Sequence, residues 1–469
     1  MMKFKSVQVS DLTVFYTKIL LDTETPTSLY LKARKESPYS FLLESVEEGN
    51  NIGRFSIVGW GKVKEIKGYS DRVIMDGKEH PTQGLYDDLR HFMSGYCWDQ
   101  DCLINGFFGY IGYESVYDIE PTISKYPLYG EQPVSCLFLP RVVAVFDKLS
   151  HEVQFVFNYL SSGDFADNEQ ILRKILAHEV ESSYLEPMNN FNEDVSFRSN
   201  FIQKDFEEIV EKAKKYIVKG DIFQVVLSQK FNSDYTGDPF LVYRYLCSLN
   251  PSPYMFYFNF GDEFQLMGTS PEIMLKKIGD TLVLRPIAGT RPRGNVLEED
   301  RDIEKELLDD AKENAEHLML VDLARNDLNR VCYSDSVKVN SYKIIERYSH
   351  VMHIVSSVSG KMLKDHDIIK AIKAVFPAGT LSGAPKVRAM QIIRELENEP
   401  RQTYGGLVGY FDFNGNFDSC ITIRSLCIKD GVAFFQAGAG IVADSVPELE
   451  YQESENKAKA MLKALSQLR

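Results

Sequence analysis

The sequence has no hydrophobic run long enough to cross a membrane. Among its 469 residues, no window approaches the roughly 20 uninterrupted apolar residues of a spanning helix. The first residues, MMKFKSVQVSDLTVFY, have neither an apolar core nor a small-residue cleavage site, which argues against a signal peptide. We therefore expect a cytoplasmic protein without a transmembrane helix.

Paired cysteines and clustered basic residues are also missing. The seven cysteines are an odd number without a CxxC pair, which excludes a disulfide framework and a zinc ribbon. The 53 Lys and Arg residues form no block, and the net charge is −14. This balance disfavours nucleic acid and anionic membranes as partners. The apolar fraction of 44% is that of an ordinary soluble globular protein.

The chain is longer than one hydrophobic core usually serves, which predicts more than one domain. Short extended runs alternate with polar turns up to about residue 160, and a helix is expected from about Asp164 to Glu181. The polar segment 182–200 follows and has the composition of a linker. We predict an N-terminal domain over 1–185 and a second domain over 195–469.

The second half mixes strand and helix periodicities. Residues 204–221 predict a helix that stops at a Gly220 cap, and DFNGNF over 412–417 predicts a hairpin turn. These patterns predict an α+β fold with large, mainly antiparallel sheets in a sandwich-like arrangement, covered by helices. Further strands are expected near 221–231, 254–260, 264–270, 281–286, 406–413, 419–428 and 432–441, and helices near 300–327, 366–376, 384–397 and the C-terminus.

Two pairs of glutamates lie at helical spacing. Glu313 and Glu316 share one helix face, and Glu450 and Glu453 repeat the spacing near the C-terminus. Each pair alone is also typical of a solvated helix surface. If the four carboxylates converged, a cation would be needed between them, and an all-oxygen set suits Mg²⁺.

The segment 404–458 combines several anion-binding groups. Gly438, Ala439 and Gly440 follow a strand, in a turn whose backbone amides can face an anion or simply close a loop. Arg424 ends the strand ITIR and can grip a carboxylate or lie at a sheet edge. Lys457 stands four residues after Glu453, as a second anion contact or an ion-pair partner within the helix.

Two residues are candidates for proton transfer. His353 lies in an apolar, β-branched segment, where a structural histidine is the competing interpretation. Glu272 follows Pro271 just after a strand, where a desolvated carboxyl can act as a general acid. The alternative for Glu272 is a residue near a helix N-terminus.

The second half of the chain contains a series of motifs, which are, in order, TSPEIML, RPIAGTRPRG, EHLMLVDLARNDL, HVMHIVSSVSG, FPAGTLSGAPKVRAMQII, YGGLVGYF, ITIRS, QAGAGIV and ESENKA. In this order they resemble the chorismate-utilising enzymes, above all the anthranilate synthase component I branch. The resemblance covers about residue 196 to the C-terminus, and FLLES and GRFSIVG near the N-terminus extend it.

The resemblance implies the chorismate-binding enzyme fold and a lyase that makes anthranilate and pyruvate from chorismate and ammonia, the first committed step of tryptophan biosynthesis. It implies Glu272 as the acid, His353 as an aid to pyruvate elimination, and Gln224 and Thr380 beside them. Mg²⁺ would be bound by Glu316 and Glu453, with Glu313 and Glu450 in support. The implied substrate contacts are Gly289, Thr290, Tyr404, Arg424, Gly438, Ala439, Gly440 and Lys457.

Two positions bear on which reaction of the family is expected. Relatives that add water resemble this chain but carry a lysine base at the position of Gln224, and ammonia needs no such base. Relatives that resemble aminodeoxychorismate synthase carry a nucleophilic lysine at the position of Ala288. Both residues favour anthranilate formation, with aminodeoxychorismate synthesis and a non-catalytic tryptophan-binding paralogue as the alternatives.

The resemblance also implies partners. LLES and NPSPYMFYF resemble the family's tryptophan inhibitor site, with Glu44, Ser45, Pro251, Tyr254 and Met255 as contacts, although a proline turn entering an aromatic strand is the competing interpretation. The sequence contains no segment resembling a glutamine amidotransferase. A separate subunit is therefore expected to supply ammonia from glutamine.

Overall fold

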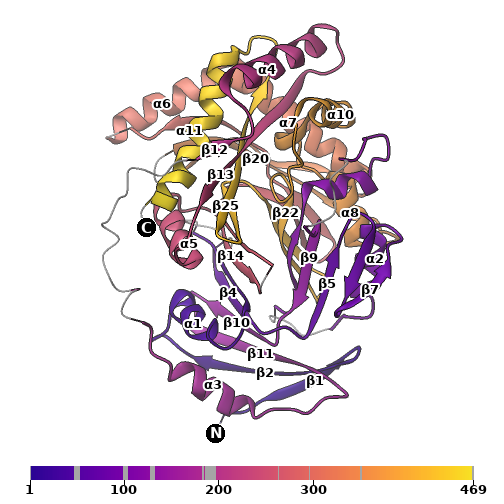
Figure 1. Ribbon diagram of the computed structural model, residues 1–469, viewed down its shortest axis with the longest axis vertical. Helices are drawn as coiled ribbons and strands as arrows, with labels where there is room; N and C mark the ends of the chain where they lie inside the picture. The colour runs from indigo at the N-terminus through magenta and orange to yellow at the C-terminus, as the bar shows by residue number, and fades with distance from the viewer. Residues whose placement is uncertain are drawn as a thin grey trace.

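The computed structural model contains two large β-sheets that pack on each other, with helices around them (Figure 1). It describes residues 2–46, 53–98, 104–126, 132–181, 184, 197–261, 263–294, 296–348 and 351–466. Phe41 of one sheet stacks on Phe108 of the other, with ring centroids 4.4 Å apart. The fold class predicted from the sequence is confirmed.

The first sheet has 13 strands within the described residues, and every pairing in it is antiparallel. Its spatial order is β1 (Lys5–Val9), β2 (Leu12–Leu20), β11 (Glu152–Leu160), β10 (Val142–Asp147), β4 (Phe55–Trp60), β3 (Tyr39–Glu44), β14 (Tyr254–Phe260), β15 (Gln265–Ser270), β24 (Ser425–Lys429), β25 (Val432–Ile441), β13 (Gln224–Asp234) and β12 (Arg198–Ser199), with β21 (Gly383–Ala384) also paired to β13.

The second sheet has 12 strands in the same described part of the chain and is also antiparallel. Its order is β18 (Ile287–Pro292), β20 (Val351–Lys361), β17 (Thr281–Leu284), β16 (Ile273–Ile278), β23 (Phe417–Ile421), β22 (Leu407–Asp412), β8 (Gly106–Ile111), β9 (Ser135–Leu139), β5 (Lys64–Gly68), β6 (Arg72–Met75) and β7 (Lys78–Pro81), with β19 (Lys338–Arg347) on β20.

Helices cover the outer faces, and α11 packs against α4, α5 and β25 (Figure 1). In the described residues no helix combines the length and apolar character needed to span a membrane. The helices are α1 (Pro26–Ala33), α2 (Leu85–Met93), α3 (Asn168–Leu176), α4 (Gln203–Val218), α5 (Pro239–Leu249), α6 (Leu297–Asp309), α7 (Ala311–Asn329), α8 (Ile368–Val375), α9 (Gly379–Ser382), α10 (Lys386–Leu396), α11 (Pro447–Ser466) and the 3₁₀ turns η1 (Tyr113–Asp118) and η3 (Ser334–Ser336).

Helix boundaries follow local capping chemistry. Helix α4 ends as predicted, with Gly220 at a φ of 82° just beyond it. The expected helix over 300–327 is instead two helices, α6 and α7, that meet at Asp310. Asp310 has an extended backbone, and its carboxylate accepts hydrogen bonds from the amides of Lys312 and Glu313. This N-cap starts a new helix where hydrophobic periodicity alone indicated continuity.

Several extended runs change from one sheet to the other. The run 419–428, expected as one strand, is β23 of the second sheet followed by β24 of the first. The apolar run 137–147 divides in the same way into β9 and β10. The chain also changes sheets between β15 and β16, at Pro271 and Glu272. Buried apolar residues lie on both sides of each crossing, so the apolar pattern does not show the change of sheet.

Strands from the two ends of the chain share both sheets. Strand β3 pairs with β14 in the first sheet, and β8 pairs with β22 in the second. Most of the expected linker, residues 182, 183 and 185–196, lies outside the described residues. The division into domains at 1–185 and 195–469 therefore stays a prediction.

Candidate functional site

Two of the crossings between sheets lie side by side and carry the central polar groups. Glu272 lies at the β15 to β16 crossing, and Arg424 lies at the β23 to β24 crossing. The amide of Ile421 donates to the Glu272 carbonyl at 3.0 Å, and the amide of Thr269 donates to the Arg424 carbonyl at 3.1 Å. These bonds fix one crossing against the other.

The structure corrects the expectation that Arg424 ends a strand. Strand β23 stops at Ile421, and Arg424 has a φ of 48°, in the left-handed region that few residues other than glycine adopt. Such a conformation at a non-glycine residue is held by its surroundings and is typical of functional sites.

Glu272 has the surroundings of a general acid. Its residue is 8% exposed, and the Thr380 hydroxyl of α9 donates to its Oε1 at 3.1 Å. Burial raises the pKa of the Glu272 carboxyl to about 8, although the Thr380 hydrogen bond and the Arg424 charge act in the opposite direction. The group is therefore mostly protonated at neutral pH and can donate a proton.

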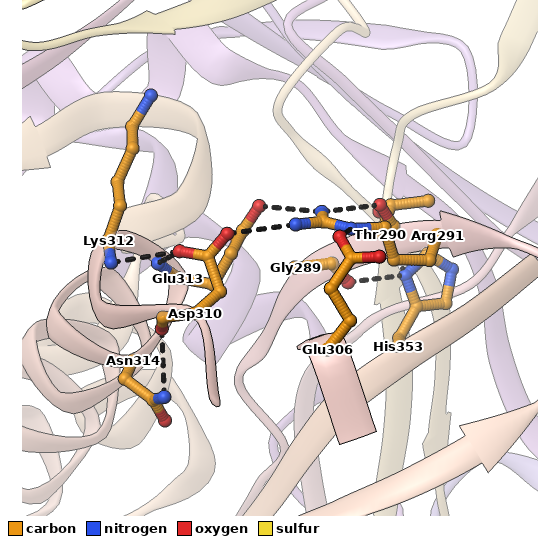
Figure 2. A network of polar contacts seen from close by, with 9 residues as sticks. All are labelled: Gly289, Thr290, Arg291, Glu306, Asp310, Lys312, Glu313, Asn314 and His353. Carbon is orange, nitrogen blue, oxygen red and sulfur yellow. Dashed lines mark hydrogen bonds and ion pairs between the residues drawn. The ribbon is translucent and has the colours of Figure 1, made fainter. Parts of the chain in front are cut away.

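His353 has the surroundings of a neutral base. It lies on β20, and its Nδ1 is 3.1 Å from the Gly289 carbonyl and 3.0 Å from the Thr290 hydroxyl (Figure 2). A carbonyl only accepts, so Nδ1 carries the hydrogen and Nε2 keeps its lone pair. Burial and, to a smaller extent, the Arg424 charge lower the pKa of His353 to about 4.

Arg424 is a half-buried cation that forms no ion pair with the described residues. Within the described residues, no hydrogen bond or ion pair reaches its guanidinium, and burial lowers its pKa. Arginine nevertheless stays charged, because its ordinary pKa is far above neutrality. The backbone around the buried Tyr404 is tied to the same crossing, since the Gly405 amide donates to the Thr422 carbonyl. Arg424 thus offers a bidentate site for a carboxylate.

QAGAGIV does not form the expected turn after a strand, because all its residues up to Ile441 belong to β25. Strand β13 pairs with this segment on one side, while β24 pairs only as far as Phe435 on the other. The Gly438 carbonyl accepts from Lys457 Nζ at 3.0 Å. The amide and carbonyl of one strand residue point to the same side, so the Gly438 and Gly440 amides face this open edge.

Gln224 lies between the open edge and helix α7. A Cβ on Gly440 would come within 2.7 Å of the Gln224 Nε2, so a larger residue there would require this amide to move. The same Nε2 donates to Glu316 Oε1 at 3.0 Å. Ala439, which lies between Gly438 and Gly440 in the sequence, is fully buried. Its side chain packs into the apolar cluster with residues of α4 and α10 and does not face the open edge.

The four glutamates lie on helices α7 and α11, and two of them form ion pairs. Glu313 pairs with Arg291 at 3.2 Å (Figure 2), and Glu453 pairs with Lys457 at 2.6 Å. Burial and the neighbouring Glu453 raise the pKa of Glu450, while Lys312 of α7 opposes this shift. Helices α7 and α11 thus bring their acidic turns into electrostatic range of each other.

The donor chemistry of these helices suits Mg²⁺, since carboxylate oxygens are its usual protein ligands and one or two are often enough. Three or more metal-binding side chains do not come together anywhere in the described residues. Glu316 and Glu453 remain the predicted ligands, with Glu313 and Glu450 in support.

The five residues of the predicted inhibitor site line one cavity of about 1380 Å³ between the two sheets. Glu44 and Met255 face each other across the β3 to β14 pair. The Tyr243 hydroxyl donates to Glu44 Oε2 at 2.8 Å, and burial raises the pKa of Glu44. Tyr254 donates to Asp418 at 2.8 Å across the same cavity. The structure thus brings Glu44, Ser45, Pro251, Tyr254 and Met255 together.

The sequence reasoning missed a buried ion pair next to the site. Arg401 and Glu397 are each 3% exposed and lie 2.6 Å apart. Their spacing of four at a helix end is also typical of a solvated pair. Only the position of Arg401 close before Tyr404 hinted at a link to the site.

Comparisons with known proteins show the family of the chain. The sequence model described as chorismate binding enzyme matches residues 31–463. "Anthranilate synthase component 1" of Aquifex aeolicus (strain VF5) is 43% identical, over 96% of this chain and 94% of that protein. The protein of that name from Acetivibrio thermocellus is 42% identical, with the same coverage.

Solved structures give the same result. Anthranilate synthase component I from Streptococcus pneumoniae TIGR4 has a TM-score of 0.76 at 35% identity, covering 89% of this chain and 94% of that one. The isochorismate synthase MenF from Escherichia coli has the same TM-score at 20% identity, covering 98% and 96%, which shows a shared fold alone. The chain belongs to the family of chorismate binding enzymes.

Proposed function

We propose that this chain converts chorismate and ammonia into anthranilate, pyruvate and water, as the large subunit of an anthranilate synthase at the first committed step of tryptophan biosynthesis. The observation that carries the proposal is the pairing of a buried carboxyl that stays protonated at neutral pH, Glu272, with the guanidinium of Arg424, which forms no ion pair with the described residues. The relatives named anthranilate synthase component 1 support it.

Chorismate is a dianion, and the site offers a receptor for each carboxylate. Arg424, with Tyr404, Lys457 and the amides of Gly438 and Gly440, would bind the enolpyruvyl carboxylate. Gly289, Thr290 and Thr380 would complete the wall around the substrate, whereas Ala439 is excluded because it packs into the apolar cluster behind the strand. When bound, Mg²⁺ would neutralise the ring carboxylate, held by Glu316 and Glu453 with Glu313 and Glu450 beside them.

The first step would use the acid. Glu272 would protonate the ring hydroxyl as its C–O bond breaks, and the hydroxyl leaves as water. The ammonia nitrogen forms a bond to the ring carbon beside the carboxylate as the ring double bonds shift, and the resulting ammonium group loses one proton, which restores the Glu272 carboxyl. Gln224 is a neutral amide, which suits a nucleophile that needs no base to remove a proton before it attacks.

The second step would restore the aromatic ring. The ring loses a proton while the enolpyruvyl C–O bond breaks, and pyruvate leaves with a new proton on its methyl carbon. The free Nε2 of His353 would assist this transfer, because Nδ1 is committed to the Gly289 carbonyl.

Two regulatory and partner roles belong to the same proposal. Ammonia would come from a separate glutamine amidotransferase subunit. Tryptophan would inhibit by binding in the cavity lined by Glu44, Ser45, Pro251, Tyr254 and Met255. The support is that the cavity offers the half-buried Glu44 carboxylate for an ammonium group, and the side chains of Tyr254 and Met255 for an indole.

One alternative reaction and one non-catalytic role are less consistent with the residues present than anthranilate formation. Aminodeoxychorismate synthesis is disfavoured because Ala288, buried beside Gly289 on β18, cannot form the covalent adduct that a lysine would. A tryptophan-binding paralogue without activity is disfavoured because Glu272, Glu316, His353, Arg424 and Glu453 are all present.

The test is product identity. Purified chain with chorismate, Mg²⁺ and ammonium at alkaline pH should release a blue-fluorescent product that co-elutes with anthranilate, and EDTA should abolish its formation. A product eluting as aminodeoxychorismate would favour the alternative reaction. Absence of any product, together with tryptophan binding in calorimetry, would favour the paralogue.

A further inference from the structure

The buried guanidinium of Arg401 joins three separate segments of the site. Its Nη1 donates to the Leu381 carbonyl at 2.7 Å, and its Nη2 donates to the Val226 carbonyl at 2.8 Å. The two other bonds of the guanidinium go to Glu397, from Nε at 2.9 Å and from Nη2 at 2.6 Å. Four donor contacts with fixed directions therefore define the position of one planar group.

Each carbonyl lies next to a proposed site residue. Leu381 follows Thr380 in the short helix α9, so the bond from Arg401 holds the turn whose hydroxyl contacts Glu272. Val226 pairs with Gly440 in the β13 to β25 register, two residues after Gln224. Arg401 thus links the proposed acid to the proposed carboxylate-binding strand.

Glu397 extends the same connection. Its Oε1 also accepts from the amide and hydroxyl of Ser228, at 2.9 and 2.7 Å. Ser228 pairs with Gly438 in register. The guanidinium carbon lies 4.7 Å from the Tyr113 ring centroid and 5.7 Å from that of Tyr404, a proposed substrate contact. Cation–π attraction to these two rings further stabilises the buried position of the Arg401 guanidinium.

We infer that Arg401 is a positioning residue that fixes the Thr380 hydroxyl against Glu272 and holds β13 in place beside Gly438 and Gly440 of β25. This inference rests on the proposed function. Lysine would keep the charge, but its single ammonium cannot reproduce the planar fork that reaches two carbonyls and a carboxylate.

The test compares Arg401→Lys and Thr380→Val with the parent enzyme in ammonia-dependent turnover. A displaced catalytic group commonly costs about 10- to 100-fold in rate. We expect a fall in kcat of that size for Arg401→Lys, with the KM for chorismate near the parent value.

The pH profile separates positioning from simple structural damage. Thr380 donates to the Glu272 carboxylate and so lowers its pKa, and loss of this bond should move the alkaline fall in kcat to higher pH. Glu272 is also faced by Arg424 and, across a small cavity, by Asp327 of α7 and Arg285. Both single variants should show the shift, and the double variant should shift no further than Thr380→Val alone.

Arg34→Lys is the matched control. Arg34 makes a comparable two-pronged contact with Asp238, from Nη1 at 3.3 Å and Nη2 at 2.9 Å, far from the site. This variant should lower the Tm while leaving kcat and the pH profile unchanged. The inference is overturned if Arg401→Lys behaves like Arg34→Lys, or if the double variant shows an additive shift.

A crystal structure of Arg401→Lys tests the inference independently of activity. The distance from Thr380 Oγ1 to Glu272 should exceed the 3.1 Å of the parent, and an unchanged distance would overturn the inference. Glu397→Gln provides the same readout if Arg401→Lys does not fold. A parent enzyme that makes no anthranilate would refute the proposed function and leave the crystallographic test in force.

Discussion

Glu272 and Glu453 are the same amino acid in opposite surroundings. Glu272 is buried between the sheets beside one hydroxyl, with a pKa raised to about 8, whereas the Glu453 side chain is 48% exposed and paired with Lys457. The first can hold a proton at neutral pH, and the second is available to a hydrated cation. The comparison teaches that burial, more than residue type, distinguishes the proposed acid from the proposed metal ligand.

The largest expected effect comes from removing the buried acid. Glu272→Gln keeps the shape but has no transferable proton, so kcat should fall by about 10²- to 10⁴-fold. The Tm should not fall, because an amide is easier to bury than a carboxyl that must ionise at higher pH. Glu79→Gln, on the exposed edge strand β7, is the control and should keep full activity. Near-parent kcat in Glu272→Gln would remove the acid role.

Substitution of the proposed Mg²⁺ ligands should change the Mg²⁺ requirement of the reaction, whereas substitution of the buried Glu272 should not. Glu316→Gln and Glu453→Gln should raise the Mg²⁺ concentration for half-maximal activity by at least about 10-fold. Saturating Mg²⁺ should then restore much of the rate, as measured in a metal titration. The same titration should leave Glu272→Gln inactive. Equal Mg²⁺ requirements in parent and variants would contradict the assignment of the ligands.

The pH dependence should report both buried groups. Glu272 must be protonated, so kcat should fall as pH rises through about 8. His353 must be neutral, so kcat should fall as pH drops through about 4. Each limb should approach about tenfold per pH unit when free ammonia is held constant. Loss of the alkaline limb in Glu272→Gln is the check on its assignment.

The smallest expected effect concerns a third glutamate, Glu44, which lines the cavity of the predicted inhibitor site. Tyr243→Phe removes the hydrogen bond that holds its carboxylate, and should weaken tryptophan inhibition by about 3- to 10-fold. Inhibition curves for the two proteins give the ratio. Tyr235→Phe, which removes a bond to the Asp238 carbonyl, should keep the parent inhibition constant. Similar inhibition curves for the parent, Tyr243→Phe and Tyr235→Phe would contradict the assignment of Glu44 to the inhibitor site.

Sequence patterns identified the fold class and most strands because alternating and apolar runs report burial. They could not locate Glu272 and Arg424 at crossings, since a break in a strand, such as Pro271, does not tell which sheet the chain enters next. The left-handed φ of Arg424 has no signal in the sequence at all. It is imposed by contacts with a segment about 150 residues away in the chain, such as the bond from the Thr269 amide.

The carboxylate pairs were readable from helical spacing, but their partners were not. Spacing placed Glu313 and Glu316 on one face, whereas the contact with Arg291 depends on α7 packing beside β18. QAGAGIV was recognisable as a run of small residues. That it remains a strand follows from the ladder to β13, a pairing partner about 210 residues earlier in the chain.

The pairing of β3 with β14 and of β8 with β22 has a consequence for how the chain can be divided. A protease cut within residues 185–196 would leave two pieces that still share two antiparallel ladders and one apolar interior. Such pieces should co-purify as a nicked enzyme. Expressed alone, each would present bare strand edges and would depend on the other to become soluble.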